Sequence, residues 1–106
     1  MKNKINYSPE ALQDLNDIGD YISINLSNRQ AAFKLLTKIL KTINLLIENP
    51  NLGTPLMSIT EIISDYRFLT VDNYMVFYRK NHTDIFIDRV LYGRRNYLSI
   101  LLEHQP

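Results

Sequence analysis

The chain has 106 residues, of which 45% are hydrophobic and 22% are charged, and its formal net charge is +1. These values exclude a disordered chain and predict one globular domain over residues 1–106. The sequence contains no cysteine. This excludes disulfides and thiolate metal sites, and it favours a reducing compartment such as the cytoplasm.

Neither a signal peptide nor a membrane helix is expected. Residues 1–10 carry charge and a proline but no apolar run, unlike a secretory signal. The longest apolar-rich stretch, residues 39–47, is interrupted by Lys41, Thr42 and Asn44, whereas a membrane-spanning helix needs about 20 apolar residues. We therefore expect no membrane partner.

The first half of the chain predicts a short strand followed by two helices. Residues 4–7 form the strand, and Ser8 can cap the first helix because its hydroxyl can accept a bond from an early N–H. Apolar residues then recur at helical spacing. The second helix is expected to start at Ser27, which can form a capping box with Gln30, and to end before Pro50.

The second half predicts a sheet. Residues 51–65 form a connector, in which residues 59–63 are either a turn of helix or a short strand. From Tyr66 the apolar period changes to two, which predicts three strands joined by tight turns at Asp72-Asn73 and Asn81-His82, over residues 66–71, 74–79 and 83–91. A last helix is expected over residues 94–103.

This order predicts an α+β fold, β-α-α-β-β-β-α, in which a helical hairpin packs on a small antiparallel β-sheet. The third long strand has apolar residues on both sides, as a central or covered strand does. Strict alternation puts Arg89 on the side of Ile87 and Leu91. Arg89 should then be partly buried and paired, or a β-bulge turns it outward.

Basic residues gather in the second half of the chain. Residues 1–65 carry six bases and seven acids, whereas residues 66–97 carry six bases and three acids. Asp88 to Tyr97 places three arginines and two tyrosines around Gly93, the residues Arg89, Arg94, Arg95, Tyr92 and Tyr97. A guanidinium fits phosphate oxygens and a tyrosine ring can stack.

Two interpretations of this segment stay open. In the first, arginines of neighbouring strands form one concave, target-binding face, made of Arg67, Arg79, Arg89, Arg94 and Arg95, with Lys80 beside them. In the second, the segment is a surface turn whose arginines are solvated or paired with nearby carboxylates. These carboxylates are Asp84, Asp88 and Glu103.

Other motifs are weak, and we expect neither a metal site nor a cofactor. His82 and His104 are isolated and are poor candidates for a general base. Asp14, Asp17 and Asp20 lack calcium-loop spacing.

The sequence resembles the RelE/ParE toxins of bacterial type II toxin–antitoxin modules. The matching segments run in order over most of the chain: residues 7–11, Asp14-Leu15, Tyr21-Ile22, Asn49-Pro50, Leu52-Gly53, Tyr66-Arg67, residues 71–79 and residues 89–97. The resemblance implies a cytoplasmic toxin that a cognate antitoxin protein silences by covering apolar surface of the helical pair. RelE-like members cut mRNA in the ribosome, and ParE-like members inhibit DNA gyrase.

Most positions of the RelE-like pattern do not match. Residues 42–66 contain no base, Met75 stands where an arginine is expected, and Leu101 stands where a tyrosine is expected. Arg94 and Arg95 do match the basic residue after the last glycine. Cleavage by a 2′-hydroxyl needs a base and an acid as well as cations, and only the cations are plainly present. The segments Tyr66-Arg67, residues 76–79 and residues 89–94 resemble ParE more closely.

Three hypotheses follow. The first is a ParE-like toxin of the plasmid-stabilising kind, which inhibits growth by binding gyrase. The second is a ribosome-dependent mRNA endoribonuclease, with candidate residues Arg67, Arg89, Tyr92, Arg94, Arg95 and Tyr97. The third is a non-toxic interaction module on the same fold, since a fold alone does not settle function.

Overall fold

The computed structural model describes residues 3–61, 64–93 and 97–102. In chain order the elements are β1 (Lys4–Tyr7), α1 (Pro9–Asp20), the π-helical turn η1 (Tyr21–Asn25), α2 (Arg29–Asn44), the 3₁₀ turn η2 (Leu45–Ile47), β2 (Thr54–Pro55), the 3₁₀ turn η3 (Leu56–Ser58), β3 (Arg67–Val71), β4 (Tyr74–Asn81), β5 (Asp84–Tyr92) and α3 (Tyr97–Leu102). The predicted α+β order is confirmed, with β2 as an additional short strand.

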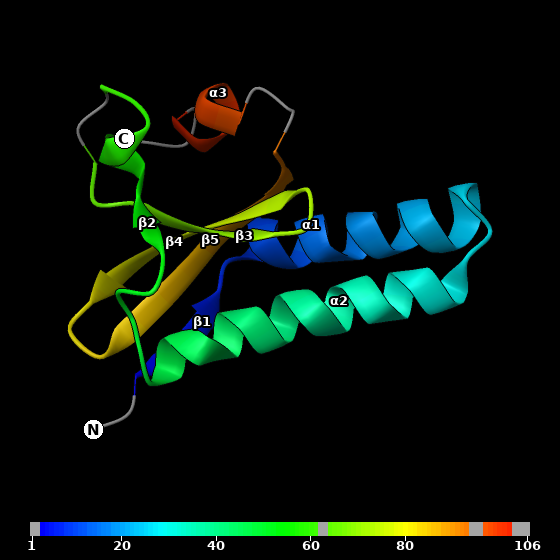
Figure 1. Cartoon of the computed structure of the whole chain (residues 1–106), viewed down its shortest axis with the longest axis horizontal. Coiled ribbons are helices and arrows are strands. Elements are labelled where there is room, and N and C mark those ends of the chain that lie inside the picture. The colour runs from blue at the N-terminus through cyan, green and yellow to red at the C-terminus, as the bar shows by residue number, and fades with distance from the viewer. Residues whose placement is uncertain (1–2, 62–63, 94–96, 103–106) are drawn as a thin grey trace.

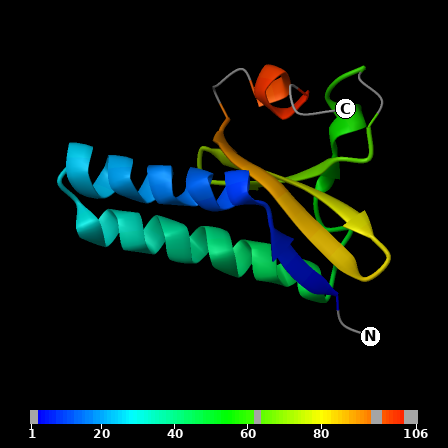
Figure 2. The same cartoon turned by 180° about the vertical axis from the view of Figure 1, so that it is seen from behind.

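The molecule has a sheet with helices on both faces. The strand order is β1-β5-β4-β3-β2. The hairpin of α1 and α2 covers one face, and α3 lies on the other (Figure 1). Both views show the two long helices side by side and extending beyond the sheet, so that their connection stands away from it (Figures 1 and 2).

The start of α1 is confirmed and the start of α2 is corrected. Ser8 caps α1, since its hydroxyl accepts a 2.9 Å hydrogen bond from the N–H of Ala11. At α2 the cap is Asn28, whose side chain accepts from the N–H of Ala31 at 3.0 Å. Ser27 lies in the left-handed region with φ 50° and takes part in the chain reversal. The predicted capping box at Ser27 is therefore wrong.

The sheet is mixed rather than purely antiparallel. β3, β4 and β5 are antiparallel as predicted. β1, however, pairs in parallel with β5, with Lys4 opposite Asp84 and Tyr7 opposite Ile87. Alternation along a strand determines which residues share a face but not which strand becomes the neighbour, so the sequence pattern did not reveal this pairing.

A β-bulge in β5 exchanges the two faces of that strand. The register shifts between Phe77, which is opposite Arg89, and Tyr78, which is opposite Ile87. Asp88 is thus the extra residue. Val90 joins Ile87 on the side of the hairpin, and Leu91 packs on the side of α3. The expected grouping of Leu91 with Ile87 is wrong, because an extra residue reverses the alternation beyond it.

Each sheet face has its own apolar core. The hairpin side is built from α1, α2 and the sheet and includes Ala11, Ile18, Ile39, Ile43, Leu46, Leu69, Val76, Tyr78, Ile85 and Ile87. The α3 side includes Leu56, Tyr66, Met75, Phe77, Leu91 and Leu101.

Two expectations fall partly outside the described residues. Residues 59–61 form neither helix nor strand, and residues 62 and 63 are not described. The helix expected over residues 94–103 is observed as Tyr97–Leu102, and residues 94–96 and 103 are not described. Within the described ranges, no helix combines the length and apolar character needed to cross a membrane.

Candidate functional site

The three described arginines of the predicted basic face have separate acceptors. Arg67 donates to the carbonyl oxygen of Gly53, Arg79 to the carboxylate of Asp88, and Arg89 to the carboxylate of Asp14. Each of these three groups is therefore bound to its own partner within the protein, and their convergence on one target-binding face stays a prediction. Arg94 and Arg95 lie outside the described residues.

Arg89 is part of a largely buried ion pair. Its Nε and Nη2 atoms lie 2.8 and 2.9 Å from the two carboxylate oxygens of Asp14. Only 17% of the Arg89 side chain and 11% of the Asp14 side chain are exposed. The hydrogen bond to Asp14 is the largest cause of the raised pKa of Arg89. The prediction that Arg89 is partly buried and paired is confirmed.

Asp14 also completes the edge of β5. Its carboxylate accepts a 2.9 Å hydrogen bond from the backbone N–H of Val90. The pairing of β1 with β5 ends at Ile87, so this N–H lies past the neighbouring strand, and a buried N–H without a partner is costly. Asp14 thus fixes α1 against β5, which leaves Arg89 bound within the protein rather than free to meet a target.

Arg67 and Tyr78 fasten the connector to the sheet. Arg67 donates to the carbonyl oxygen of Gly53 at 2.7 Å, and the Tyr78 hydroxyl accepts from the N–H of Gly53 at 2.8 Å. The same hydroxyl donates to the carbonyl oxygen of Pro50 at 2.9 Å. A Cβ on Gly53 would lie 2.6 Å from the Tyr78 ring and hydroxyl and 2.8 Å from the Phe68 carbonyl oxygen. Only glycine permits this approach.

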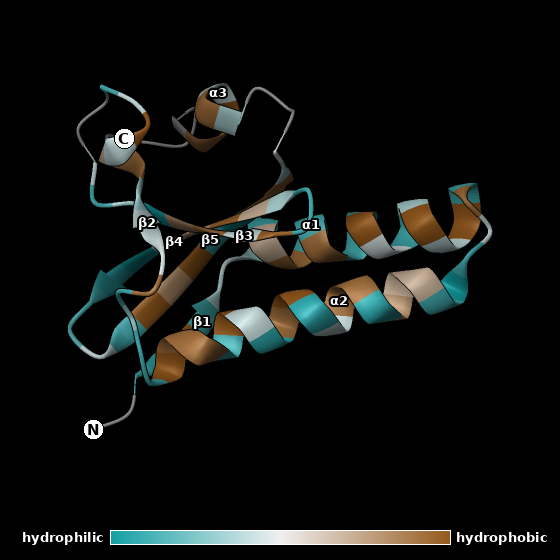
Figure 3. Cartoon of the chain, in the orientation of Figure 1, coloured by the Kyte–Doolittle hydropathy of each residue, from teal (hydrophilic) through white to brown (hydrophobic). Residues whose placement is uncertain are grey.

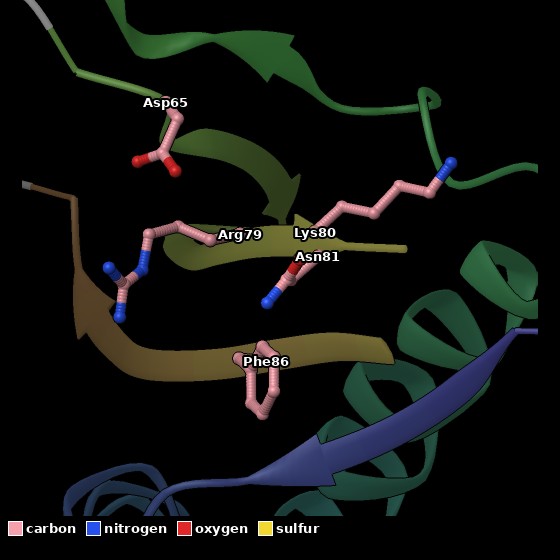
Figure 4. A pocket seen from close by; sticks show the side chains of 5 residues that line it. All are labelled: Asp65, Arg79, Lys80, Asn81 and Phe86. Carbon is pink, nitrogen blue, oxygen red and sulfur yellow. The ribbon is translucent and has the colours of Figure 1, made fainter. Parts of the chain in front are cut away.

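Arg79 lines a hollow that is open to solvent on the α3 side of the sheet. The hollow has a volume of about 310 Å³ and is lined by Asp65, Arg79, Lys80, Asn81 and Phe86. We call it the Arg79 hollow. Figure 4 shows the side chains of Arg79 and Lys80 leaving β4 in different directions, with Asp65 on one side and the Phe86 ring on the other.

The buried Tyr66 and the largely buried Asp88 hold the partly exposed Arg79 in place. Its Nε atom lies 2.9 Å from Asp88, and its guanidinium carbon lies 5.1 Å from the centroid of the Tyr66 ring. Burial disfavours the charged form of Arg79 and lowers its pKa. The charge and hydrogen bond of Asp88, together with the charges of Tyr66 and Asp65, have the larger opposite effect, so that the pKa of Arg79 is raised. Burial, and next the hydrogen bond to Asp88, raises the pKa of Tyr66 to about 12. Arg79 is therefore a permanently charged, oriented group.

The two tyrosines expected to stack on bases contact other rings. Tyr97 stacks on Phe77 in the α3-side core, with centroids 5.4 Å apart and planes at 30°. Tyr92 meets Tyr74 edge-on at 5.6 Å. The turn before β5 places His82 in an exposed position. Within residues 3–61, 64–93 and 97–102, no three metal-ligating side chains are close enough to hold an ion.

The comparisons with known proteins agree with this architecture. The sequence model of the ParE toxin of the type II toxin–antitoxin system parDE matches residues 5–97. This chain belongs to the ParE toxin family. The match decides between the two branches of the RelE/ParE resemblance in favour of ParE. The protein is thus the toxin of a type II toxin–antitoxin module.

A solved structure supports the fold of this ParE toxin. It is titled "Chromosomal ParDE TA system from P. aeruginosa", and it matches with a TM-score of 0.69 over 83% of this chain and 92% of the other. The two sequences are 22% identical, so the likeness concerns the fold. A comparison with curated protein sequences finds no match.

Proposed function

We propose that this ParE toxin inhibits growth by binding an essential cytoplasmic protein, DNA gyrase, and that it does not cleave RNA. The gyrase target follows from the resemblance to ParE-like toxins, and one observation supports the absence of RNA cleavage: the described candidates for a ribonuclease site are used in internal contacts. Arg67 is bound to Gly53, Arg89 to Asp14, and Tyr97 is stacked on Phe77. A cleavage site needs these groups free to face a substrate.

The Arg79 hollow is the described part of the proposed gyrase-binding face. Phe86 exposes 37% of its surface there, next to the exposed Lys80 and the oriented guanidinium of Arg79. Aromatic and arginine side chains are the groups that most often dominate the affinity of protein interfaces. Arg94 and Arg95, which the sequence pattern assigned to the same face, remain part of the proposal.

The helical hairpin is the proposed surface for the antitoxin. Large apolar side chains stay exposed along it, most of all Phe33 at 72% and Ile24 at 69%, and the set also includes Leu12, Tyr21, Leu26, Leu40 and Leu45. Figure 3 shows hydrophobic bands on both helices in the part that extends beyond the sheet, with a hydrophilic first turn in α2. Apolar surface of this kind marks a protein-interaction site, and membership of a toxin–antitoxin family makes an antitoxin the expected partner.

The proposal is tested by induced expression together with a supercoiling assay. Wild-type toxin should elongate cells, induce the DNA-damage response and inhibit purified gyrase. Replacing Arg94 and Arg95 together by Ala should abolish both effects, and Lys80→Ala with Phe86→Ala should weaken them. Lys34→Ala, an exposed base on α2, is the matched control and should act as wild type. A toxic chain without effect on gyrase contradicts the target, and a chain without toxicity favours the non-toxic module.

The ribonuclease remains a second candidate because of one observation. Asp65, Arg79 and Lys80 line the same hollow, which provides a carboxylate and two cations for phosphodiester chemistry. This reading predicts arrest of translation and mRNA cuts at codon boundaries after induction, with supercoiling unaffected. Asp65→Asn should then remove the cuts, whereas under the first proposal neither the wild type nor this variant produces cuts.

A further inference from the structure

A second hollow lies between α1 and the ends of β4 and β5. It is lined by three tyrosines and two aspartates, with an apolar floor: Tyr21, Tyr74, Tyr92, Asp14, Asp17 and Ile18. We call it the tyrosine hollow. Its volume is about 170 Å³, below the roughly 300–1,000 Å³ of sites for cofactors and drug-sized ligands. It has room for one side chain of a partner.

The three tyrosines converge on this hollow. Tyr74 and Tyr92 meet edge-on with their ring centroids 5.6 Å apart. Burial is the main cause of the raised pKa of Tyr74, and the neighbouring phenols of Tyr92 and Tyr21 add to it. Tyr21 itself is 54% exposed, so its ring forms the rim. Tyrosine rings beside a hollow can attract a cation to their faces.

The charges around the hollow also favour a cation. Both oxygens of Asp14 are bound by Arg89 and Val90, so this carboxylate is neutralised. Asp17, which accepts one bond from Gln13, is exposed at the rim. Residues 9–20 of α1 contain four acids and no base. An incoming positive charge therefore meets a carboxylate, aromatic rings and the field of an acidic helix.

We propose that the tyrosine hollow receives one arginine or lysine side chain of the cognate antitoxin. This proposal rests on the proposed function, in which the antitoxin covers the helical hairpin of the toxin. Tyr21 belongs both to this hollow and to the exposed apolar residues of the hairpin, so the two surfaces are continuous. The antitoxin segment that covers the hairpin would thus carry a basic residue next to its apolar ones.

The first test uses the full toxin chain and a small probe. N-acetylarginine methylamide is titrated into the protein, and the NMR signals of Tyr21, Tyr74 and Tyr92 are followed. We expect saturable shifts with arginine and none with N-acetylcitrulline methylamide, which has nearly the same shape without the charge. Equal shifts with both probes would overturn the proposal.

Exposed positions provide matched variants that leave the fold intact. Tyr21→Leu and Asp17→Asn should each weaken binding of the arginine probe about threefold to tenfold, the range of a partly exposed cation–π or ion-pair contact. Tyr21→Phe keeps the ring, and Asp20→Asn removes an acid of α1 that does not line the hollow; both should bind as wild type. Unchanged binding in Tyr21→Leu and Asp17→Asn would contradict the site.

The second test identifies the occupant. In the complex with the antitoxin encoded beside the toxin, the arginine probe should no longer shift the tyrosine signals, because the hollow is filled. Asp17→Asn toxin should still inhibit growth but need more antitoxin for rescue. Undiminished probe binding in the complex would overturn the assignment to the antitoxin. Lack of growth inhibition by wild-type toxin would instead contradict the proposed function, since the probe titration does not depend on toxicity.

Discussion

Asp14, Gly53, Arg67 and Arg89 were among the residues that carried the resemblance to the toxin family, and the structure gives each of them a structural role. Asp14 and Arg89 join α1 to β5, while Gly53 and Arg67 join the connector to β3. At the scale of single residues, the motif therefore reports how the fold is assembled. The groups that bind the target need not be among the residues of this motif that are paired inside the protein.

The Asp14–Arg89 pair should be costly to break and less costly to replace. Asp14→Leu leaves a guanidinium in a largely buried position and should lower the free energy of unfolding by about 3 kcal/mol. The double variant Asp14→Leu/Arg89→Met should lose clearly less stability, because it also removes the charge that Asp14→Leu leaves unpaired. Urea denaturation measures both. Asp17→Asn, one turn away and exposed, is the control and should lie within about 0.5 kcal/mol of wild type.

Gly53 should tolerate no side chain. Its Cβ position lies 2.6 Å from Tyr78 and 2.8 Å from a backbone oxygen, so Gly53→Ala should destabilise the protein by about 2 kcal/mol or more. At Gly19 the nearest atom is the flexible end of Leu36 at 3.0 Å, and alanine favours the helix. Gly19→Ala should hence be nearly neutral. Thermal unfolding of the two variants tests the contrast, and equal losses would argue against it.

At the scale of elements, two local features decide which side chains face where. The bulge at Asp88 turns Val90 toward the hairpin and Leu91 toward α3. The connection between α1 and α2 puts Ser27 in the left-handed region and leaves the cap to Asn28. Both features depend on single residues that a periodic pattern cannot single out.

The helix cap gives a direct test at this scale. Asn28→Ala removes the acceptor for the N–H of Ala31 and should cost about 1 kcal/mol. Ser27→Gly should leave stability unchanged or raise it by up to about 1 kcal/mol, because glycine adopts a positive φ without strain. Chemical denaturation separates the two. A loss in Ser27→Gly with none in Asn28→Ala would restore the capping box.

At the scale of the whole molecule, the sheet separates two cores, and buried tyrosines occupy both. Tyr78 lies in the hairpin-side core and Tyr66 in the α3-side core. Burial is the first cause of the raised pKa of Tyr7, Tyr66, Tyr74 and Tyr78. Stability is then linked to pH in the alkaline range.

The sign of this linkage is a loss at high pH. Tyr66 ionises near pH 10 in the unfolded chain and near pH 12 in the folded one. The contribution of Tyr66 to the free energy of unfolding is fully present below pH 10. It decreases as the pH rises toward 12, by about 2–3 kcal/mol in total. Urea midpoints at pH 8, 10 and 11 measure the decline, and Tyr66→Phe should make it shallower. Parallel declines in both proteins would exclude Tyr66 as a cause.

The sequence by itself determined the α+β order, the cap at Ser8, the hairpin strands and the partial burial of Arg89, because these follow from local chemistry and from periods of 3.6 and 2. The sequence also named Asp88 as a carboxylate that could pair with an arginine, and Arg79 does pair with it, but Asp14, the partner of Arg89, was not named for this role. Only the tertiary structure decided the parallel pairing of β1 with β5, the separate partners of Arg67, Arg79 and Arg89, and the meeting of Tyr21, Tyr74 and Tyr92. Each of these joins residues far apart in the chain, and contacts at long range are set by packing of whole elements rather than by any local pattern.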